Sequence, residues 1–178
     1  MKFYRSGRDA MARLGLAAPE EMAEVEARFP VYVNEYYLGL IDPADWKNDP
    51  IARQVLPDEA ELADHSSSFD PLAEEEQMPV PRLIHRFEDR VVLPATGRCA
   101  MRCRFCFRKR EWADGADLAD ITESELTAAA DYLVGHPEIR EVLISGGDPL
   151  MLPFPRLKRL VETIAALPSI EVIRIGSR

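Results

Sequence analysis

The sequence contains few cysteines and no long apolar run. Only 3 of its 178 residues are cysteine, an odd number that cannot pair fully into intramolecular disulfides, and a reducing compartment would keep such thiols free. No apolar stretch reaches the roughly 18 residues that a membrane-spanning helix needs, and the first residues, Met1 to Gly7, lack the apolar core of a signal peptide. We therefore expect a cytoplasmic protein with no membrane partner.

Basic residues are scarce relative to acidic ones. The chain has 31 Asp and Glu against 22 Lys and Arg, which gives a formal net charge of −9. Because nucleic-acid binders neutralise phosphates with a basic surface, this balance argues against a nucleic-acid partner. The length allows one domain with a sizeable core and is too short for two large domains.

The first 85 residues are predicted to form a helical and irregular N-terminal segment. Pro19–Phe29 has the pattern of an amphipathic helix opened by a proline, and Val31–Leu40 is a second apolar segment whose type the pattern leaves open. Proline-containing turns then dominate as far as Met78–Pro81. We expect residues 1–85 to wrap or cap another part of the protein.

From residue 86 onward, strand and helix patterns alternate. Two helices are predicted, Thr122–Val134, opened by a capping box from Thr122 to Glu125, and Arg156–Leu167. Strands are predicted at Arg90–Thr96, Glu141–Ser145 and Glu171–Ile175. This order is typical of parallel strands joined by right-handed crossovers. We predict an α/β fold in which residues 86–178 form the first part of a (β/α) barrel, cut off after about three strands.

All the cysteines lie in one short segment, "CAMRCRFC". Their positions, Cys99, Cys103 and Cys106, would suit one buried stripe of a helix, since free cysteine packs as a small apolar side chain, but arginines crowd the same segment. A structural zinc site needs four ligands, and the histidines of the chain are not at zinc-binding spacing from these thiols. An iron–sulfur cluster accounts for more, because three close thiolates can hold three irons of a cubane and leave the fourth iron open to a ligand.

A second motif, "ISGGDP", follows the next predicted strand. It places two glycines and Asp148 at the carboxyl end of that strand, where barrel enzymes carry their active sites. Alone, it would be an ordinary turn, although glycines also let backbone carbonyls approach the charged amino group of a cofactor. Together, the two motifs resemble the radical S-adenosylmethionine superfamily, in which C-x3-C-x2-C has an aromatic residue, here Phe105, before its last cysteine.

Five segments make the resemblance more specific. They are "DPIARQVLP" (49–57), "DPLAEEEQMPVPRLIHRFEDRVVL" (70–93), "CRFCFRKR" (103–110), "SGGDPLM" (145–151) and "VIRIGSR" (172–178). They resemble the lysine 2,3-aminomutase family, whose fold is similar to a partial (β/α) barrel behind a helical N-terminal segment. The resemblance implies a reduced [4Fe–4S] cluster that cleaves S-adenosyl-L-methionine to methionine and a 5′-deoxyadenosyl radical. It also implies pyridoxal 5′-phosphate and migration of an amino group from C2 to C3 of an amino acid.

The resemblance implies roles for residues in both motifs. The iron ligands would be Cys99, Cys103 and Cys106. Phe105 would pack near the adenine of S-adenosylmethionine. The methionyl end of that cofactor would be framed by Gly146, Gly147 and Asp148.

Three arginines also match family positions. Arg86 and Arg90 match positions that help to hold the phosphate of pyridoxal phosphate, where a guanidinium suits a dianion. Arg108 matches the arginine that binds the substrate carboxylate. On spacing alone, Arg86 and Arg90 could equally be solvated surface residues, and Arg108 could belong to a solvated basic run.

The family's pyridoxal-phosphate lysine and its substrate-selecting acidic residues lie beyond residue 178. None of the lysines in this chain matches that position; they are Lys2, Lys47, Lys109 and Lys158. We therefore expect a longer product, a partner chain that supplies the rest, or a remnant that holds a cluster without completing the rearrangement.

The substrate expected first is free L-lysine, converted to β-lysine, because "YYLGLIDPADWKNDP" (36–50) is more like the free-lysine aminomutases. Phe107 and "GGDPLM" are more like the branch that serves β-lysylation of elongation factor P. Glutamate is also a substrate of relatives. The resemblance implies an electron donor such as flavodoxin or ferredoxin, and a homo-oligomer is possible. The alternatives are another radical enzyme on this scaffold and a truncated, non-catalytic module that binds zinc or no metal.

Overall fold

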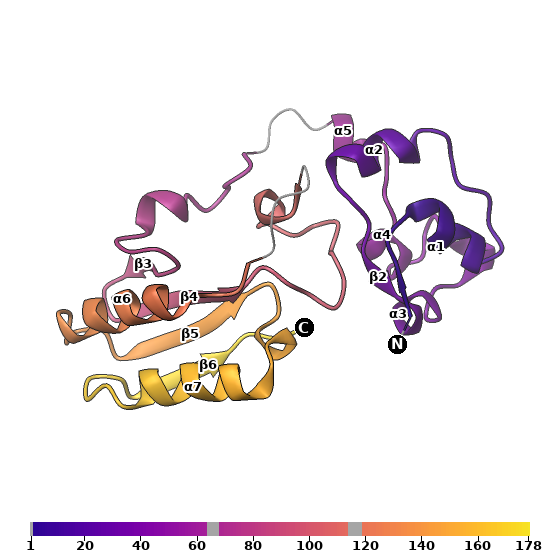
Figure 1. Cartoon of the computed structure of the whole chain (residues 1–178). Helices are drawn as coiled ribbons and strands as arrows, with labels where there is room; N and C mark the ends of the chain where they lie inside the picture. Colours follow the sequence, from indigo (N-terminus) through magenta and orange to yellow (C-terminus); the bar gives the residue numbers. More distant parts are fainter. Residues whose placement is uncertain (1, 64–67, 114–118) are drawn as a thin grey trace. The chain divides into compact units, whose positions relative to one another are not determined.

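The computed structural model describes residues 2–63, 68–113 and 119–178 (Figure 1). The chain divides into two compact units. Unit 1 comprises Met1–Pro71 and Ala100–Asp117, and unit 2 comprises Leu72–Cys99 and Leu118–Arg178. The boundary at residue 85 that the composition predicts stays a prediction. In the part of the chain that is described, no helix is both long enough and apolar enough to cross a membrane.

Unit 1 consists of short elements around an apolar core of its own. They are β1 (Phe3–Tyr4), α1 (Gly7–Arg13), α2 (Met22–Arg28), β2 (Val33–Asn34), α3 (Glu35–Leu38), η1 (Pro43–Asp45), α4 (Ala52–Val55), α5 (Ala60–Ala63) and η3 (Lys109–Glu111). β1 and β2 pair antiparallel. The core contains Met11, Leu38, Val55 and Met101, and Cys103 packs against it. The cysteine segment after residue 99 is therefore part of this core.

The two predictions for the first 40 residues have different outcomes. The predicted helix at Pro19–Phe29 is confirmed as α2, but it begins at Met22, because Pro19 opens a turn in which its carbonyl accepts a hydrogen bond from the Met22 N–H at 3.3 Å. Val31–Leu40 divides into β2 and α3. Asn34 makes this switch, because its side-chain oxygen accepts a hydrogen bond from the Tyr37 N–H at 2.9 Å and caps α3.

Unit 2 is built on a four-stranded sheet in the order β3-β4-β5-β6. Its elements are η2 (Glu75–Gln77), β3 (Ile84–Phe87), β4 (Arg90–Thr96), α6 (Glu123–Val134), β5 (Glu141–Gly146), η5 (Pro149–Met151), α7 (Phe154–Ala165) and β6 (Val172–Ile175). β3 and β4 form an antiparallel hairpin, whereas β4, β5 and β6 are parallel. The predicted α/β class and its three parallel strands are confirmed, and the sheet that they form is open rather than closed into a barrel.

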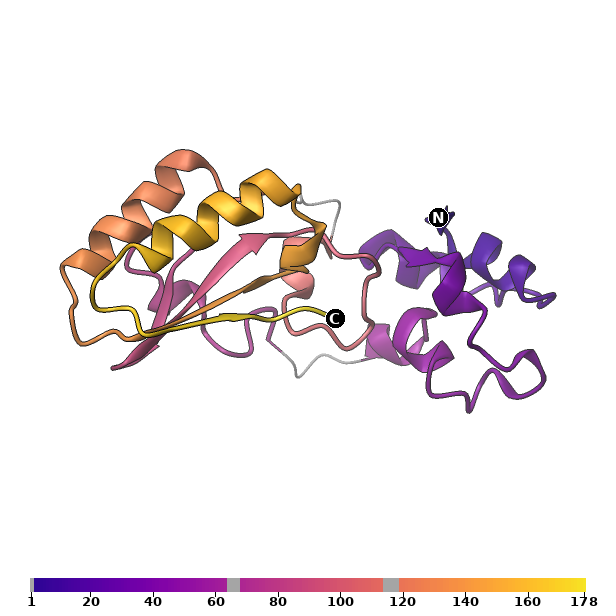
Figure 2. The same cartoon turned by 90° about the horizontal axis from the view of Figure 1, so that it is seen from below.

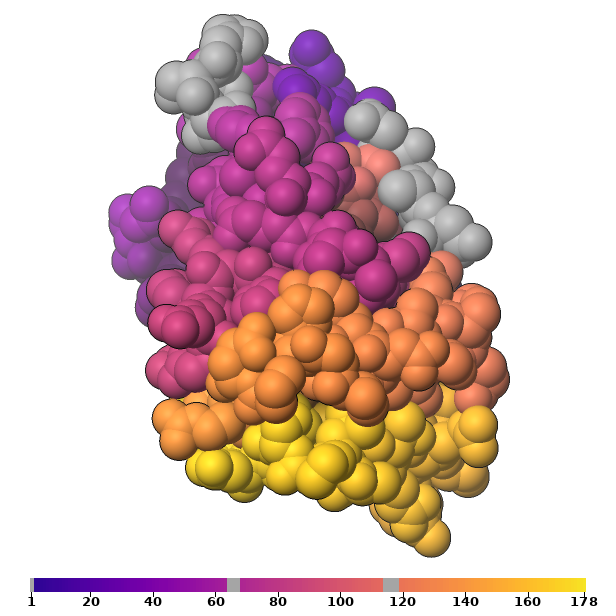
Figure 3. Space-filling view, turned by 90° about the vertical axis from the view of Figure 1, so that its left-hand side faces the viewer, coloured from indigo at the N-terminus to yellow at the C-terminus, as the bar shows by residue number. Residues whose placement is uncertain are grey.

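Helices α6 and α7 cover one face of this sheet (Figures 1 and 2). Alternate residues of β4 and β5 point to them, because side chains of a strand alternate between its faces. The fully buried members of this layer include Leu93, Ile144, Leu133 and Ile164. Seen from the end where the parallel strands begin, the loops after α6 and α7 lie side by side in orange and yellow, with the magenta segment around β3 beside them (Figure 3). The opposite end of the sheet carries the two sequence motifs.

The predicted capping box at the start of α6 is confirmed. The Thr122 hydroxyl accepts a hydrogen bond from the Glu125 N–H at 3.2 Å, and the Glu125 carboxylate accepts one from the Thr122 N–H at 2.7 Å. The reciprocal pair satisfies two backbone donors that a helix start leaves open. Hydrogen bonding to the carboxylate outweighs the effect of burial and lowers the pKa of Glu125.

Thr122→Ala should loosen α6 specifically. Loss of the capping oxygen should cost about 1 kcal/mol, which is roughly a fivefold rise in amide hydrogen-exchange rates within the helix. Thr127→Ala is the matched control, because the Thr127 hydroxyl only donates to the Glu123 carbonyl inside α6, and it should change stability by less than about 0.5 kcal/mol. Equal effects of the two substitutions would show that the cap contributes nothing special.

Candidate functional site

The backbone that leads to the first cysteine is tied to the Gly-Gly-Asp turn. β4 ends at Thr96 and β5 ends at Gly146, so both segments leave the carboxyl edge of the parallel sheet. The Gly147 N–H donates to the Thr96 carbonyl at 2.6 Å, and the Asp148 N–H donates to the Arg98 carbonyl at 2.7 Å. The chain therefore reaches Cys99 from a fixed starting point.

The two glycines make this approach possible. A Cβ atom on Gly146 would lie within 3.0 Å of the Thr96 carbonyl oxygen, and one on Gly147 would lie within 3.0 Å of the Arg98 carbonyl oxygen. Gly146 also has φ of +116°, which L side chains rarely adopt. The sequence predicts that the missing side chains of these glycines leave room for a cofactor. In the structure, the same missing side chains leave room for the backbone of residues 96–98.

Asp148 is buried, and its side chain accepts two hydrogen bonds. One of its carboxylate oxygens accepts hydrogen bonds from the Leu150 N–H at 3.0 Å and from the Ser177 hydroxyl at 2.9 Å. The first bond caps η5, and the second joins the turn to the residues that follow β6. Asp148 thus holds together the carboxyl ends of two neighbouring strands.

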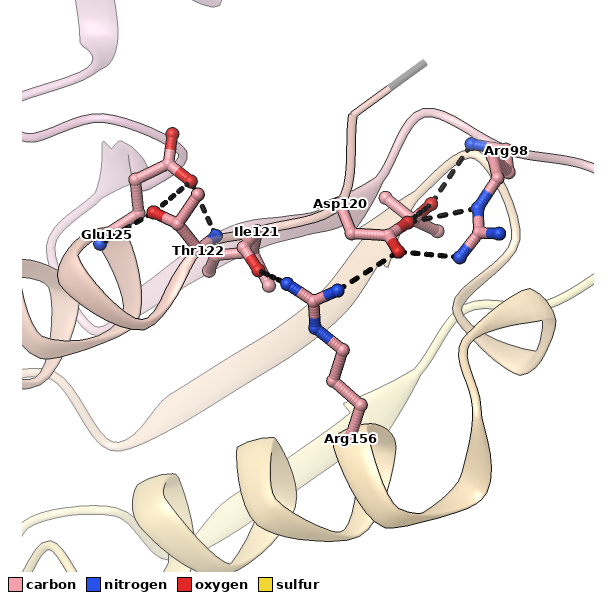
Figure 4. A network of polar contacts seen from close by, with 7 residues as sticks. Arg98, Asp120, Ile121, Thr122, Glu125 and Arg156 are labelled. Carbon is pink, nitrogen blue, oxygen red and sulfur yellow. Dashed lines mark hydrogen bonds and ion pairs between the residues drawn. The ribbon is translucent and has the colours of Figure 1, made fainter.

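A polar network fixes the end of β4 (Figure 4). Asp120 accepts hydrogen bonds from the Thr96 hydroxyl at 2.6 Å and from the Arg98 guanidinium at 3.0 and 2.6 Å. Arg156, in the first turn of α7, donates to Asp120 at 3.2 Å and to the Ile121 carbonyl at 2.6 Å. One carboxylate therefore links β4, the approach to α6 and the start of α7.

The partners of Asp120 favour its charged form. Burial raises the pKa of Asp120, but the hydrogen bonds from Thr96 and Arg98, together with the charges of Arg98 and Arg156, outweigh it, so that the pKa lies below its usual value. Sequence analysis missed this residue. Its partners lie 24, 22 and 36 positions away in the chain, and no local pattern reveals pairs at such separations.

Cys103 and Cys106 lie in unit 1, on a turn in which the Cys106 N–H donates to the Cys103 carbonyl at 3.1 Å. Between them, Phe105 leaves 63% of its surface exposed. Phe105 and Cys106 line a pocket of about 500 Å³, together with Phe29, Phe69 and other residues of unit 1. An exposed aromatic ring beside a thiol at a pocket is an arrangement that can receive a ligand.

The thiols have the chemistry of iron or zinc ligands. None of the three forms a disulfide, and all three are partly buried. Cys99 belongs to unit 2, whereas Cys103 and Cys106 belong to unit 1, and among the described residues no three His, Cys, Asp or Glu side chains are gathered as a metal site. The donor set nevertheless fits an iron–sulfur cluster, because soft thiolates are the ligands that such clusters take.

The three predicted arginines have different surroundings. Arg86 is exposed on β3, and Arg90 is half exposed at the start of β4, where its guanidinium bonds the Asp89 carboxylate at 2.8 and 3.0 Å. Both lie at the end of the sheet opposite to Cys99, about 20 Å along β4 at 3.3 Å per residue. Arg108 is buried in unit 1, 4.7 Å from the Phe107 ring centroid and 4.0 Å from Glu111. Arg86 and Arg90 thus belong to unit 2, and Arg108 belongs to unit 1.

Comparison with known proteins supports the resemblance. Residues 93–177 match the family model described as "Radical SAM superfamily". This part of the chain is therefore similar to a radical SAM domain. The matched range begins inside β4 and ends after β6, so it contains the cysteine motif and the Gly-Gly-Asp turn. The resemblance that these two motifs carry is confirmed.

Curated relatives are similar to this chain over most of its residues. An L-lysine 2,3-aminomutase from Clostridium subterminale is 38% identical over 160 residues, which are 89% of this chain and 38% of that protein. One from Acetoanaerobium sticklandii is 42% identical over 147 residues, 82% of this chain and 35% of that protein. A glutamate 2,3-aminomutase from Clostridioides difficile is 34% identical over 159 residues, 89% of this chain and 37% of that protein. The similarity to lysine 2,3-aminomutases is confirmed, and the chain spans well under half the length of these relatives.

Gly147→Ala should destabilise the carboxyl end of the sheet. The added methyl group would collide with the Arg98 backbone, and we expect a loss of about 2 kcal/mol or more, measured from amide exchange in β4 and β5. Gly135→Ala is the matched control, because its added atom would lie 3.4 Å from the Tyr132 carbonyl oxygen and 3.8 Å from the Asp131 carbonyl oxygen, and it should change stability by less than about 0.5 kcal/mol. A Gly147→Ala protein as stable as the control would contradict the tight approach.

The Asp120 network should lose its stabilising effect in acid. Because the pKa of Asp120 is lower in the folded protein, its contribution is complete above the unfolded pKa of about 3.9 and is lost as the pH falls through the folded value. Asp120→Asn should reduce the free energy of unfolding of unit 2 by about 1 kcal/mol at pH 7, a modest figure because Arg98 and Arg156 are partly solvated. The gap between the two proteins should close below about pH 4, as followed by urea unfolding with exchange of β5 amides. A constant gap from pH 7 to pH 3 would contradict this assignment.

Proposed function

We propose that this chain carries the cluster-binding part of a radical S-adenosylmethionine aminomutase. One observation carries the proposal: the C-x3-C-x2-C segment starts directly after the carboxyl end of a parallel strand, and that strand end is hydrogen-bonded to the Gly-Gly-Asp turn after the next strand. The family match and the relatives named L-lysine 2,3-aminomutase support the same assignment.

Cys99, Cys103 and Cys106 are the proposed iron ligands. When bound, a [4Fe–4S] cluster with one open iron would supply the electron that cleaves S-adenosylmethionine to a 5′-deoxyadenosyl radical. The protein's share is to bind and to orient. The anchored end of β4 fixes the position of Cys99 in unit 2. The hydrogen-bonded turn fixes the spacing between Cys103 and Cys106.

Phe105 and the Gly-Gly-Asp turn are the proposed contacts for S-adenosylmethionine. The exposed ring of Phe105 offers a flat apolar face of the kind on which an adenine can stack. The side-chain-free surface of Gly146 and Gly147 permits close approach of a ligand wherever it is not occupied by residues 96–98.

Conversion of L-lysine to β-lysine is the reaction that we propose for the whole protein. Seven of the relatives are named L-lysine 2,3-aminomutase or putative L-lysine 2,3-aminomutase, and one is named for glutamate. We propose Arg108 as the contact for the substrate carboxylate. Its guanidinium is buried beside Phe107, and desolvation strengthens a charge-assisted hydrogen bond to a carboxylate.

Pyridoxal phosphate is the second cofactor that we propose from the family resemblance. Arg86 and Arg90 are accessible to a phosphate, but Arg90 is already paired with Asp89, and this hydrogen bond lowers the pKa of Asp89. The two arginines also lie at the amino end of β4. They do not form a phosphate site with the residues of the carboxyl end, so we derive no step through pyridoxal phosphate.

The proposed chemistry also bears on partners and location. A cluster that delivers single electrons needs a one-electron donor, and flavodoxin or ferredoxin would serve. Three cysteines that form no disulfide and must remain reduced to bind iron suit the cytoplasm, which is the location that we propose.

Anaerobic reconstitution with iron and sulfide tests the proposal. The reduced protein should show a [4Fe–4S]+ signal by electron paramagnetic resonance, the signal should shift when S-adenosylmethionine is added, and 5′-deoxyadenosine should form. Cys103→Ala should abolish all three, whereas Cys103 is not needed for the fold of unit 2. A second arm adds L-lysine and pyridoxal phosphate to the whole protein, for which the conversion is proposed, and measures the formation of β-lysine. A colourless protein that takes up stoichiometric zinc in place of iron, with wild type and Cys103→Ala alike in the resonance experiment, would favour the non-catalytic metal-binding module.

A further inference from the structure

The turn between Cys103 and Cys106 carries a buried arginine. The side chain of Arg104 is 5% exposed and lies against Glu61 of α5. Its Nε and Nη2 atoms donate to the two oxygens of the Glu61 carboxylate, both at 2.9 Å, and its Nη1 donates to the Phe29 carbonyl at 3.0 Å. This two-pronged geometry fixes the direction of the side chain as well as its distance, because guanidinium and carboxylate are both planar.

The same carboxylate also holds the far side of the turn. Lys109 donates to Glu61 at 2.7 Å, and its ammonium lies 4.5 Å from the centroid of the Phe29 ring. Glu61 therefore binds one cation that precedes Cys106 and one that follows it. The carboxylate is 12% exposed, so solvent screens these pairs only weakly.

The backbone around the turn is fixed by separate segments of unit 1. The Arg104 N–H donates to the Gln54 carbonyl at 2.8 Å, and the Arg102 N–H donates to the Tyr32 carbonyl at 2.8 Å. Cys103 packs against the apolar core. Residues 102–109 are thus held from several sides by contacts within unit 1.

A buried ion pair is a poor device for stability alone, because desolvation of the two charges offsets most of their attraction. Well-packed apolar side chains would stabilise the same region at least as well. What the pair does supply is a unique conformation. Ordering a loop costs conformational entropy, so a turn that is ordered beforehand binds iron without that loss.

We propose that Arg104 and Glu61 are positioning residues that hold the Cys103–Cys106 turn in its ligand-binding conformation in the metal-free protein. The identity of the metal rests on the proposed function above. The ordering of the turn does not, because it concerns contacts within unit 1 alone. The identity of the metal and the ordering of the turn can therefore be disproved separately.

The experiment measures how fast each thiol of the metal-free, reduced protein reacts with iodoacetamide, by mass spectrometry of the three cysteines. Arg104→Lys and Glu61→Asp keep every charge but cannot reproduce the two parallel hydrogen bonds between the guanidinium and the carboxylate. Each should accelerate labelling of Cys103 and Cys106 by about threefold or more, since a loosened turn exposes both thiols more often. Labelling of Cys99, which belongs to unit 2, should stay unchanged. Arg13→Lys is the matched control, because the Arg13–Glu35 pair of unit 1 is about half exposed, and it should leave all three rates unchanged.

Reconstitution of the same variants with ferrous iron and sulfide gives the second readout. Arg104→Lys and Glu61→Asp should retain about threefold less iron than wild type at limiting iron, while Arg13→Lys should match wild type. Unchanged labelling of Cys103 and Cys106, or equal acceleration at Cys99, would overturn the positioning role. If one variant fails to fold by circular dichroism, the other decides. Failure of the wild type to take up iron, with the labelling pattern as expected, would overturn the proposed function and leave the ordered turn standing.

Discussion

The close approach between the end of β4 and the Gly-Gly-Asp turn is the constraint on which the candidate site depends. Without side chains at Gly146 and Gly147, two backbone hydrogen bonds form across the carboxyl edge of the sheet. They determine where the chain leaves β4 and therefore the position of Cys99. Any side chain at these positions would push apart two parallel strands whose pairing is the centre of unit 2.

Anchoring of the cysteine segment uses a different kind of interaction on each side. In unit 2, backbone hydrogen bonds and the partly solvated Asp120 network hold the residues before Cys99. In unit 1, a buried carboxylate and an apolar core hold the residues around Cys103 and Cys106. Glycines, a shared aspartate and a shared glutamate therefore each act on the backbone that bears the thiols, none of which is in a disulfide.

Much of the fold follows from local patterns, whereas the supports of the site do not. The strands, the two long helices and the Thr122 cap each depend on residues close together in sequence, and the sequence predicts them. Asp120 and Glu61 depend on partners more than 20 positions away, so nothing near them in the chain marks their role. The motifs locate the cysteines and Asp148, but the bond from Ser177 to Asp148 exists only once β5 and β6 are paired. Local pattern predicts which residues carry the chemistry, and folding determines what holds them.

The position of Asp120 has a consequence for how unit 2 opens. Its carboxylate joins Thr96, the last residue of β4, to Arg156 in the first turn of α7. Arg156 also donates a hydrogen bond to the carbonyl of the next residue, Ile121. Fraying of α7 at its start would therefore release β4 at its end, since both share one acceptor. The two elements should behave as one cooperative folding unit, although more than 50 residues of sequence separate them.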